Sequence, residues 1–489
     1  MDFKLSGEDL LQVRCSLLVI GGFEGEAIRG AVKRIDDALG GVLSRTCEEE
    51  RFNGEMGKSI MINTLGKIGA QRVLLLGLGK KSKFSQDVLR KVGIIAAKRA
   101  RTFSDTVVFG IPNNGKKGGA SAIVEGVMLG SYEFSKYKTN GKKGQGIKSV
   151  QLLSTKIRER EFREEVEFAR IISDSTNLAR DLVNEPPMNM TPTKLADVAK
   201  EIARAEKLEC RIFDRDEMEK RGMGGLLAVS RGSEEPPKFI HLCYEPKGSA
   251  KKTVAIVGKG ITFDSGGLCI KTRDNMRTMK GDMSGAACVL GVMKGVPKLN
   301  PSVRVHGLIS ATENMPGARA YKPDDIIRAL NGKTIEVIDT DAEGRIVLSD
   351  ALSYAVELKV DEIVDIATLT GSCIVALGEY TAGLMGNNER LINRIMQTAK
   401  VAGEKVWQLP MDDELRKEIE SDVADVKNVG GRWGGAITAA MFLEKFVGST
   451  PWVHLDIAGP AFLEKGGDWY PKGGTGFGVR TIIKYLLQK

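Results

Sequence analysis

Short apolar runs alternate with helical stretches along almost the whole chain. In the first third, four runs are predicted to be buried strands and two stretches to be the helices between them: residues 17–20, 72–76, 106–111 and 147–153, then residues 87–101 and 120–129. Alternation of this kind is typical of proteins in which helices cover a largely parallel sheet. The sequence therefore predicts an α/β fold.

A strongly charged stretch over residues 157–183 separates this part from the rest and is predicted to be a long connecting helix that two prolines stop. The alternation then resumes, with strands expected at residues 210–213, 239–244, 254–257, 303–308, 334–338, 362–366 and 453–457, and helices such as 284–294 and 348–358 between them. We therefore expect an N-terminal α/β domain over 1–155, a linker helix over 156–185 and a larger C-terminal α/β domain over 186–489. A basic, glycine-rich loop is predicted over residues 136–146.

The net charge of +9 is distributed unevenly. Residues 1–150 contain 25 basic and 15 acidic side chains, which leaves 47 basic and 48 acidic side chains for the rest of the chain. The excess is concentrated in residues 51–150, with 19 basic and 5 acidic side chains. Such an excess suits a nucleic-acid partner, but basic faces are often only solvated. The charge therefore concerns the N-terminal domain and not the larger one.

The chain has only three histidines, and they are far apart in sequence. This spacing excludes the HExxH motif and every zinc site built from several histidines, so carboxylates must supply most ligands of any bound metal.

The seven cysteines include no CxxC pair, which favours a reducing compartment over a disulfide framework. The polar N-terminus has no signal core, and the thirteen-residue uncharged run at 366–378 is too short for a bilayer. We therefore expect a cytoplasmic protein that does not bind membranes.

A first group of candidate ligand-binding and catalytic residues follows the strand predicted at 254–257. Residues 257–267 read VGKGITFDSGG, in which glycines flank Lys259 and Asp264 comes five residues later. Glycines allow backbone to approach a ligand closely. Lys271 follows, and Asp282 lies where a helix is expected to begin. Taken singly, Asp282 has an ordinary explanation as a helix cap and the lysines have one as solvated charges.

A second group follows the strand predicted at 334–338, where residues 338–345 read IDTDAEGR. In an extended chain, Asp339, Asp341, Glu343 and Arg345 would project to one side because the strand period is two. Three carboxylates on one side repel each other unless cations neutralise them. The alternative is an acidic turn ahead of the helix predicted from residue 348.

From the two groups we take four carboxylates and three cations as the candidate set: Asp264, Asp282, Asp341 and Glu343, with Lys259, Lys271 and Arg345. Both groups follow predicted strands, and the carboxyl ends of strands form the usual ligand-binding edge of open α/β sheets. Hard oxygen ligands in this number suit two divalent ions that activate a water and polarise a carbonyl or phosphoryl group. The residues alone therefore predict a two-metal hydrolase and leave its substrate open.

These motifs resemble the leucyl (cytosol) aminopeptidase family in order and spacing. The resemblance rests on VGKGITFDSGG (257–267), MKGD (279–282), ENMPGARAYKP (313–323), TDAEGR (340–345), NEPPMNMTP (184–192) and HLDIAGP (454–460). It covers most of residues 157–489, whereas the N-terminal third matches mainly by position and size. The resemblance implies a macro-like N-terminal domain and a catalytic peptidase domain with a mixed central sheet.

The resemblance also implies a role for individual residues. The ligands of two divalent ions, Mn²⁺ or Zn²⁺, would be Lys259, Asp264, Asp282, Asp341 and Glu343, with Asp264 and Glu343 bridging. Lys271 would polarise the scissile carbonyl, and Arg345 would bind a bicarbonate ion that acts as general base. The pocket for the first side chain would be lined by Met279, Thr368, Gly371 and Ala458, for which packing in the core is an equally good explanation.

The implied activity is release of N-terminal residues, preferably leucine and other apolar ones, from peptides by a homohexamer. Two alternatives stay open. Some bacterial members of the family bind DNA, so the basic N-terminal domain could have that additional role. A phosphatase with the same two-metal chemistry is the other alternative.

The sequence departs from the family pattern at three positions. Asp339 stands where the family has asparagine, which adds a carboxylate beside the expected metals. Ile346 replaces leucine, and Asp324 replaces a glycine. None of these changes removes a proposed ligand, but Asp339 could alter metal preference or pair with Arg345.

Overall fold

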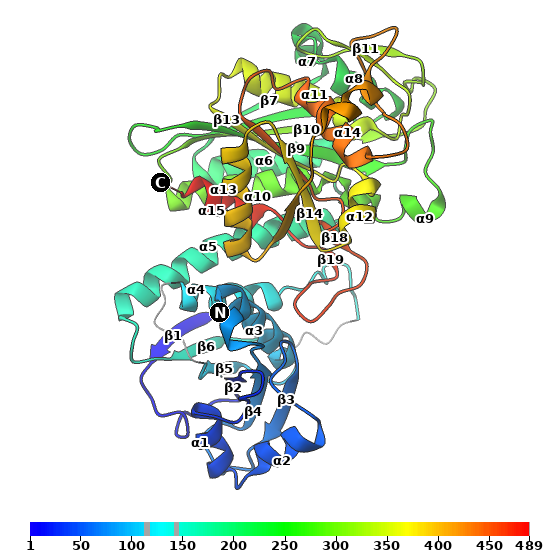
Figure 1. The fold of residues 1–489 in the computed structure, drawn as a ribbon. Coiled ribbons are helices and arrows are strands. Elements are labelled where there is room, and N and C mark those ends of the chain that lie inside the picture. The colour runs from blue at the N-terminus through cyan, green and yellow to red at the C-terminus, as the bar shows by residue number, and fades with distance from the viewer. Residues whose placement is uncertain (112–117, 141–145, 489) are drawn as a thin grey trace. The chain divides into compact units, whose positions relative to one another are not determined.

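The structure is a computed structural model that describes residues 1–111, 118–140 and 146–488, and the chain divides into two compact units (Figure 1). Unit 1 contains Met1–Ser173 and Gly467–Trp469, and unit 2 contains Asp174–Gly466 and Tyr470–Lys489. Helix α5 (Glu159–Asn184) begins in unit 1 and ends in unit 2. The proposed boundaries of the accessory domain, linker and catalytic domain stay predictions. Part of the loop predicted at 136–146 lies outside the described residues.

Unit 1 is built on a six-stranded sheet in the order β1-β6-β5-β2-β4-β3. Its strands are β1 (Asp2–Ser6), β2 (Leu17–Gly22), β3 (Ser59–Asn63), β4 (Arg72–Gly77), β5 (Thr106–Phe109) and β6 (Ser149–Leu153). All neighbours pair in parallel except β3 and β4, which pair antiparallel. The strands predicted in the first third are therefore present, whereas β1 and β3 were not predicted from the sequence.

Helices cover both faces of this sheet: α1 (Ala31–Ala38), α2 (Val42–Glu49), α3 (Gln86–Ala100) and α4 (Gly119–Gly130). Because side chains alternate along a strand, Leu17 and Val19 of β2 pack in the core with α3, α4 and α5, whereas Leu18 and Ile20 pack with α1 and α2. Both faces of the central strands are thus buried, which explains their continuous apolar runs.

Unit 2 contains an eight-stranded mixed sheet in the order β15-β14-β17-β13-β9-β10-β8-β7. Its strands are β7 (Glu209–Phe213), β8 (Lys238–Tyr244), β9 (Thr253–Asp264), β10 (Arg304–Asn314), β13 (Glu362–Ala367), β14 (Thr381–Gly386), β15 (Lys405–Gln408) and β17 (Trp452–Asp456). The central strands β17, β13, β9 and β10 run parallel, while the outer pairs β10-β8, β8-β7 and β17-β14 are antiparallel. The predicted α/β class with a mixed central sheet in the larger domain is confirmed.

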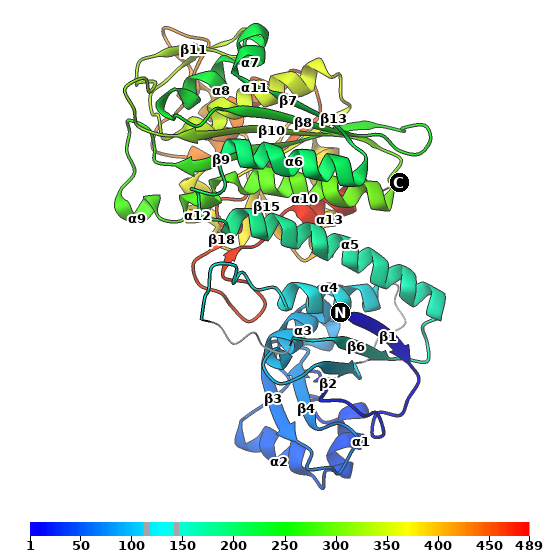
Figure 2. The ribbon, with the colours of Figure 1, turned by 180° about the vertical axis from the view of Figure 1, so that it is seen from behind.

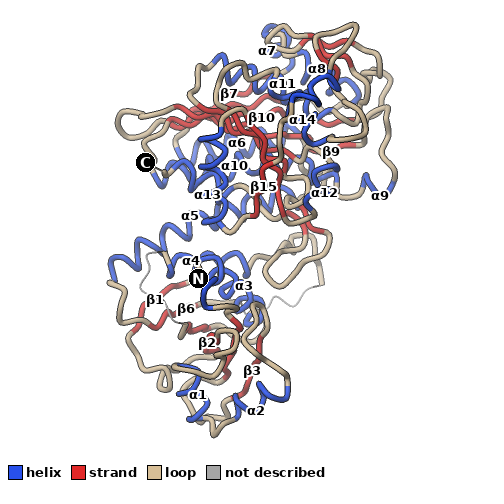
Figure 3. Tube along the Cα trace, viewed as in Figure 1, coloured by secondary structure: helices blue, strands red, loops and turns tan. Residues whose placement is uncertain are grey.

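Two layers of helices enclose the sheet of unit 2 (Figures 2 and 3). One layer contains α6 (Pro192–Glu206), α10 (Ser284–Leu299), α13 (Glu389–Ala402) and α15 (Val479–Leu486), and the other contains α8 (Gly224–Val229), α11 (Glu343–Glu357) and α14 (Gly435–Glu444). The remaining elements are short: α7 (Arg215–Arg221), α9 (Arg273–Met276), α12 (Gly371–Leu377), β11 (Ile326–Arg328), β12 (Thr334–Glu336), β16 (Val426–Lys427), β18 (Phe462–Leu463), β19 (Gly473–Gly474), and the 3₁₀ turns Lys81–Lys83, Ser230–Gly232, Met279–Met283 and Asp413–Ile419. Among the described residues, no helix combines the length and apolar character needed to cross a bilayer.

Residues 338–345 are not extended, and the alternative, an acidic turn ahead of a helix, is what the structure shows. Strand β12 ends at Glu336 and belongs to a separate three-stranded sheet, and α11 begins at Glu343, five residues before the predicted start. The Asp339 carboxylate accepts a hydrogen bond from the Asp341 backbone N at 2.8 Å. An Asp side chain that bonds the backbone two residues on favours a turn over a strand. Asp339 therefore closes the turn that presents Asp341.

Asp324, where the family pattern has glycine, has a backbone φ of 69°. This left-handed region is unfavourable for residues with a Cβ, although Asp tolerates it better than most. We expect Asp324→Gly to raise the free energy of unfolding and Asp324→Ala to lower it, with about 1 kcal/mol between the two variants. Urea unfolding of both measures the difference. Equal stabilities would mean that this backbone conformation is not strained.

Candidate functional site

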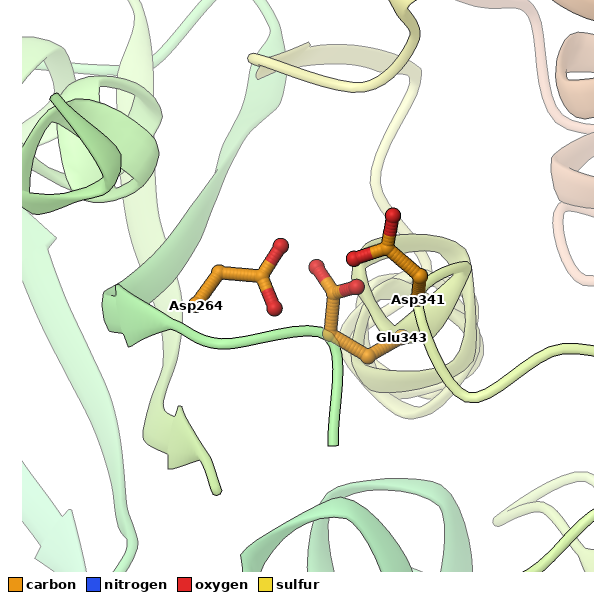
Figure 4. Close-up of side chains that lie close together, drawn as sticks. All are labelled: Asp264, Asp341 and Glu343. Atoms are coloured by element: carbon orange, nitrogen blue, oxygen red, sulfur yellow. The ribbon is translucent and has the colours of Figure 1, made fainter. Parts of the chain in front are cut away.

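The candidate site lies in unit 2, where β9 ends and α11 begins. Asp264 is the last residue of β9, Asp341 lies in the turn before α11, and Glu343 is the first residue of α11. One carboxylate oxygen from each of the three lies within 4.8 Å of the others. Figure 4 shows the three side chains pointing toward one another. Residues that are 79 positions apart in sequence thus converge on one point, as the ligands of a metal ion must.

Lys259 lies in the middle of β9 and is almost completely buried. Its Nζ atom is 2.8 Å from Asp282 Oδ2 and 2.8 Å from Glu343 Oε1. Asp282 comes from the 3₁₀ turn Met279–Met283 that leads into α10. A Cβ on Gly344 would lie 2.6 Å from Nζ, so a side chain at that position would displace the lysine ammonium group. Lys259 therefore joins Asp282 to the three converging carboxylates.

Lys271 makes the corresponding contacts on the other side of the site. Its Nζ atom is 2.8 Å from Asp264 Oδ2 and 2.6 Å from Asp341 Oδ1. Its side chain is 13% exposed, compared with 4% for Lys259, so it lies closer to solvent. Two ammonium groups thus stand among four carboxylates, and the expected meeting of the two sequence groups occurs.

Asn314 is a site residue that the motif reading did not single out. Its Nδ2 atom donates to Asp264 Oδ1 at 2.8 Å and to the Thr340 carbonyl at 3.0 Å. The Gly266 backbone N also donates to Asp264 Oδ1, at 2.9 Å. Asn314 is the last residue of β10 and pairs with Asp264 across the two strands. Its position at the end of the strand beside β9 was the available signal, because polar residues at neighbouring strand ends share one edge of a sheet.

Burial changes the acidity of the carboxyl groups. It raises the pKa of Glu343 to about 8, an effect that the nearby Asp264 carboxylate strengthens and Lys259 opposes. Burial likewise raises the pKa of Asp282 to about 6, against the effect of Lys259. Both oxygens of Glu343 are buried, and neither accepts a hydrogen bond within the described part of the chain, although Oε1 forms the ion pair with Lys259. Buried carboxylate oxygens without donors fit a site built for cations.

The two lysines respond to opposing effects. Burial alone would lower the pKa of Lys259, but Asp282 and Glu343 raise it above its ordinary value. Burial also disfavours the charged form of Lys271, and Asp264 outweighs it, so the pKa of Lys271 is raised as well. Without a metal, both ammonium groups therefore stay charged and neutralise part of the carboxylate charge.

Arg345 lies in the first turn of α11 and is buried. Its Nη1 atom donates to the Asn428 carbonyl at 2.7 Å, and its Nε has no hydrogen-bond partner among the residues that the structure describes. Burial lowers the pKa of Arg345 to about 10, while Glu343 acts in the opposite direction. The guanidinium thus keeps its charge and retains an unused donor, which suits an anion. Among the described residues, Arg345 forms no hydrogen bond or ion pair with Asp339, although the Asp339 carboxylate also favours the charged form and so opposes the lowering of the Arg345 pKa by burial.

The four residues expected around the first side chain, Met279, Thr368, Gly371 and Ala458, line one pocket together with Asp264, Lys271, Asp282 and Asp341. The pocket wall also includes residues that the sequence reading missed: Asn275, Thr278, Leu369, Thr370, Ile374, Glu379, Phe462 and Glu464. The lining is mixed, and its apolar members, Met279, Leu369, Ile374, Ala458 and Phe462, here called the apolar wall, lie in the same pocket as Asp264 and Asp341. This arrangement allows hydrolysis beside an apolar side chain.

Comparison with known proteins gives two family matches. Residues 177–483 match the model of the "Cytosol aminopeptidase family, catalytic domain", and residues 19–141 match that of the "Cytosol aminopeptidase family, N-terminal domain". The chain is 46% identical to a "Probable cytosol aminopeptidase" of Persephonella marina, with all of both chains covered. It is 47% identical to a protein with the same description from Aquifex aeolicus, with 100% of this chain and 98% of the relative covered.

Two solved structures have the same fold over nearly the whole chain. A tomato leucine aminopeptidase variant has a TM-score of 0.92 and 36% identity, covering 100% of this chain and 97% of its own. A bottromycin maturation enzyme in complex with Mn has a TM-score of 0.84 and 34% identity, covering 97% of this chain and 99% of its own. Similarity on this scale extends through both units of the structure.

Proposed function

The chain belongs to the cytosol aminopeptidase family, and from that membership we propose how its site releases an N-terminal residue from a peptide. It is a metal-dependent aminopeptidase, a hydrolase that acts on peptide substrates. The observation that carries the mechanism is the convergence of Asp264, Asp341 and Glu343 beside a pocket that also presents apolar side chains. Family membership decides the open choice between peptide and phosphate ester for the peptide.

We propose that two divalent ions, Mn²⁺ or Zn²⁺, are held by Lys259, Asp264, Asp282, Asp341 and Glu343. The four carboxylates provide the charge and the hard oxygen atoms that such ions need, and Lys259 lies between two of them. To act as a ligand, Lys259 must lose its proton on metal binding. Bound ions of this kind polarise a carbonyl and lower the pKa of a bound water.

Lys271 and Arg345 are positively charged residues that are not among the proposed metal ligands. Lys271 stays protonated and lines the pocket, so its Nζ can donate to the scissile carbonyl oxygen and to the oxyanion that develops there. Arg345 has the unused Nε donor, which would hold bicarbonate as the general base. The two roles follow from side-chain chemistry. The flexible ammonium group of Lys271 can follow the negative charge that develops on the carbonyl oxygen, whereas the buried, planar guanidinium of Arg345 suits a planar anion such as bicarbonate.

The pocket wall favours a medium-sized apolar first residue such as leucine. Met279, Ile374, Ala458 and Phe462 provide apolar surface, and Gly371 adds no side chain that would fill the space. Burying one additional methylene in such a pocket discriminates between substrates by about 1–3 kcal/mol. We therefore propose leucine and other apolar residues as the preferred N-terminal residues.

Hydrolysis of leucine amide by the Mn²⁺- or Zn²⁺-loaded protein tests this function. Leucine amide should be cleaved, whereas N-acetyl-leucine amide, which lacks the free amine, should be resistant. A phosphate monoester tests the competing phosphatase. Cleavage of the acetylated substrate at a similar rate, or hydrolysis of the ester alone, would overturn the proposal.

Metal binding should tighten as the pH rises. Because the pKa of Glu343 is raised to about 8, this carboxyl group is protonated below that pH and must release its proton when it becomes a ligand. We expect the affinity of the metal-free protein for Mn²⁺ to increase by roughly tenfold or more between pH 6 and 8. Calorimetric titrations at several pH values measure this. An affinity independent of pH would exclude a protonated ligand in the metal-free site.

We further propose that the protein is a cytoplasmic homohexamer, as the family resemblance implied. Its curated relatives are described as cytosol aminopeptidases. DNA binding by the basic N-terminal domain stays a prediction, and nothing in the described part of unit 1 favours it. Several of its basic side chains have local partners: Lys33 and Lys91 pair with carboxylates, and Arg72 packs on Phe103.

A further inference from the structure

Residues 368–370, here called the strap, connect the end of β13 to the start of α12 and form part of the pocket wall. One end of the strap is bound to the candidate metal ligands. Lys259 Nζ donates to the Thr368 carbonyl at 3.0 Å, and Thr368 Oγ1 donates to Asp282 Oδ1 at 2.8 Å. The position of the strap and that of two proposed ligands are therefore coupled.

The other end of the strap is held by Asp456, the last residue of β17. Asp456 Oδ2 accepts a hydrogen bond from Thr370 Oγ1 at 2.7 Å. Its Oδ1 accepts from the backbone N atoms of Leu369 and Ala458, each at 3.1 Å. The side chain is 0% exposed, so water does not compete for these donors. A buried carboxylate with this many donors fixes their positions, because an unsatisfied buried donor is costly.

Thr370 transmits this constraint to the next helix. Its Oγ1 accepts a hydrogen bond from the Cys373 backbone N at 3.1 Å, which makes Thr370 the N-cap of α12. Gly371 and Ile374, in the first turn of α12, both line the pocket. Asp456 itself is absent from the lining that the described residues form. It thus lies behind the wall that would contact the first side chain of a peptide.

We propose that Asp456 is a positioning residue that sets the specificity of the pocket by holding the strap and the start of α12 in place. This inference rests on the proposed function, because it concerns the same pocket. The Asp456 carboxylate binds Leu369 and Thr370 in the strap and also Ala458, so it holds in place two segments of the pocket wall that are distant in sequence. If the strap and the start of α12 moved, the pocket would fit a leucine side chain less well. A smaller first side chain, such as that of alanine, makes fewer contacts with the pocket wall and would lose less affinity.

Asp365 provides a matched control, because it is a second buried carboxylate on the neighbouring strand β13. Its oxygens contact Trp452 Nε1 and His454 Nδ1, and neither partner lines the pocket. Asp365→Asn should therefore lower the thermal stability as any loss of a buried charge partner does, and leave substrate preference unchanged. The comparison separates a role in the pocket from a role in stability alone.

The test is the ratio of kcat/KM for leucine amide to that for alanine amide in the Mn²⁺-loaded protein. In Asp456→Asn, an NH2 group replaces one of the two accepting oxygens, so the side chain no longer accepts from Thr370 Oγ1 and from the two backbone N atoms together. Thr370→Val removes the bond from the other side, and with it the hydrogen bond that caps α12. We expect each variant to lower the ratio on the order of tenfold, mainly through KM for leucine amide. Metal content should equal that of the wild type, Thr370→Ser should restore the ratio, and the double variant should resemble the single ones.

A ratio within about twofold of wild type in Thr370→Val and in any folded Asp456→Asn would overturn the inference, whatever the loss of Tm. If Asp456→Asn does not fold, Thr370→Val tests the contact that holds the start of α12, and an unchanged ratio would overturn the claim that Asp456 sets specificity through this helix. An equal fall of the ratio in Asp365→Asn would also overturn it. A wild-type protein that cleaves neither amide would refute the proposed function instead, so the two failures are distinguishable.

Discussion

Replacing Glu343 with glutamine should lower kcat for leucine amide by more than about a thousandfold, equivalent to roughly 4 kcal/mol of transition-state stabilisation. Glu343 is 1% exposed, and its oxygens point toward Asp264 and Asp341. Glutamine keeps the volume, so the fold should survive. It removes the charge and places an amide where Lys259 and an ion would meet a carboxylate. Steady-state kinetics combined with metal analysis measure the effect, and metal content should fall as well.

Glu404 offers a matched control for this variant. It is also buried, and its oxygens accept hydrogen bonds from the backbone N atoms of Gly478 and Thr481 at the start of α15. Glu404→Gln should reduce thermal stability but leave the metal content and the kcat of the folded protein near wild type. Metal content and kcat near wild type in Glu343→Gln would remove this residue from the metal site.

Replacing Lys271 with methionine should lower kcat by about 10²–10³-fold while the metal content stays unchanged. Methionine has a similar length but no charge, so the oxyanion loses its donor. Lys271 contacts Asp264 and Asp341 only as a counter-ion. Without it, less of the negative charge on these two carboxylates is neutralised, so they should bind a metal ion at least as well. KM should change less than kcat, because the lost interaction is made mainly in the transition state.

Lys280 is the control for this second variant. It is nearby in sequence and partly buried, but its Nζ donates to the Asn184 carbonyl at 2.6 Å and does not contact the proposed ligands. Lys280→Met should therefore retain most of kcat. If Lys271→Met lost the metal, Lys271 would have a structural role or be a ligand, and an unchanged kcat would exclude its role with the oxyanion.

The part of the site that could be predicted from sequence is the part fixed by regular elements. The strand predicted at 254–257 is the first part of β9, which continues through Lys259 and ends at Asp264, and Asp282 precedes α10. The prediction that both carboxylates lie at one edge of the sheet therefore survives, although the strand is longer than expected. No two histidines are close in sequence, which directed attention to carboxylates, and the structure brings the carboxylates together. The structure also pairs His241 with His306, a contact that their separation in sequence concealed. The mixed sheet was expected only from the family resemblance.

The rest depended on local turns and contacts distant in sequence. The sequence left two conformations open for residues 339–345, an extended segment and an acidic turn. The hydrogen bond from Asp341 N to the Asp339 carboxylate forms the turn, and α11 starts at Glu343. Periodicity cannot reveal such a bond, because it depends on one side chain meeting one backbone donor. Asn314 and Asp456 were missed for a related reason: each acts through residues far away in sequence.

The most direct test of the account is a titration of the metal-free protein with Mn²⁺, in which bound ions per chain and hydrolysis of leucine amide are followed together. We predict two bound ions per chain, with full activity only when both sites are filled. In Glu343→Gln, this stoichiometry and the activity should be lost together. Full activity with a single ion per chain, or two bound ions without hydrolysis at any pH from 6 to 9, would contradict a two-metal aminopeptidase site built from these carboxylates.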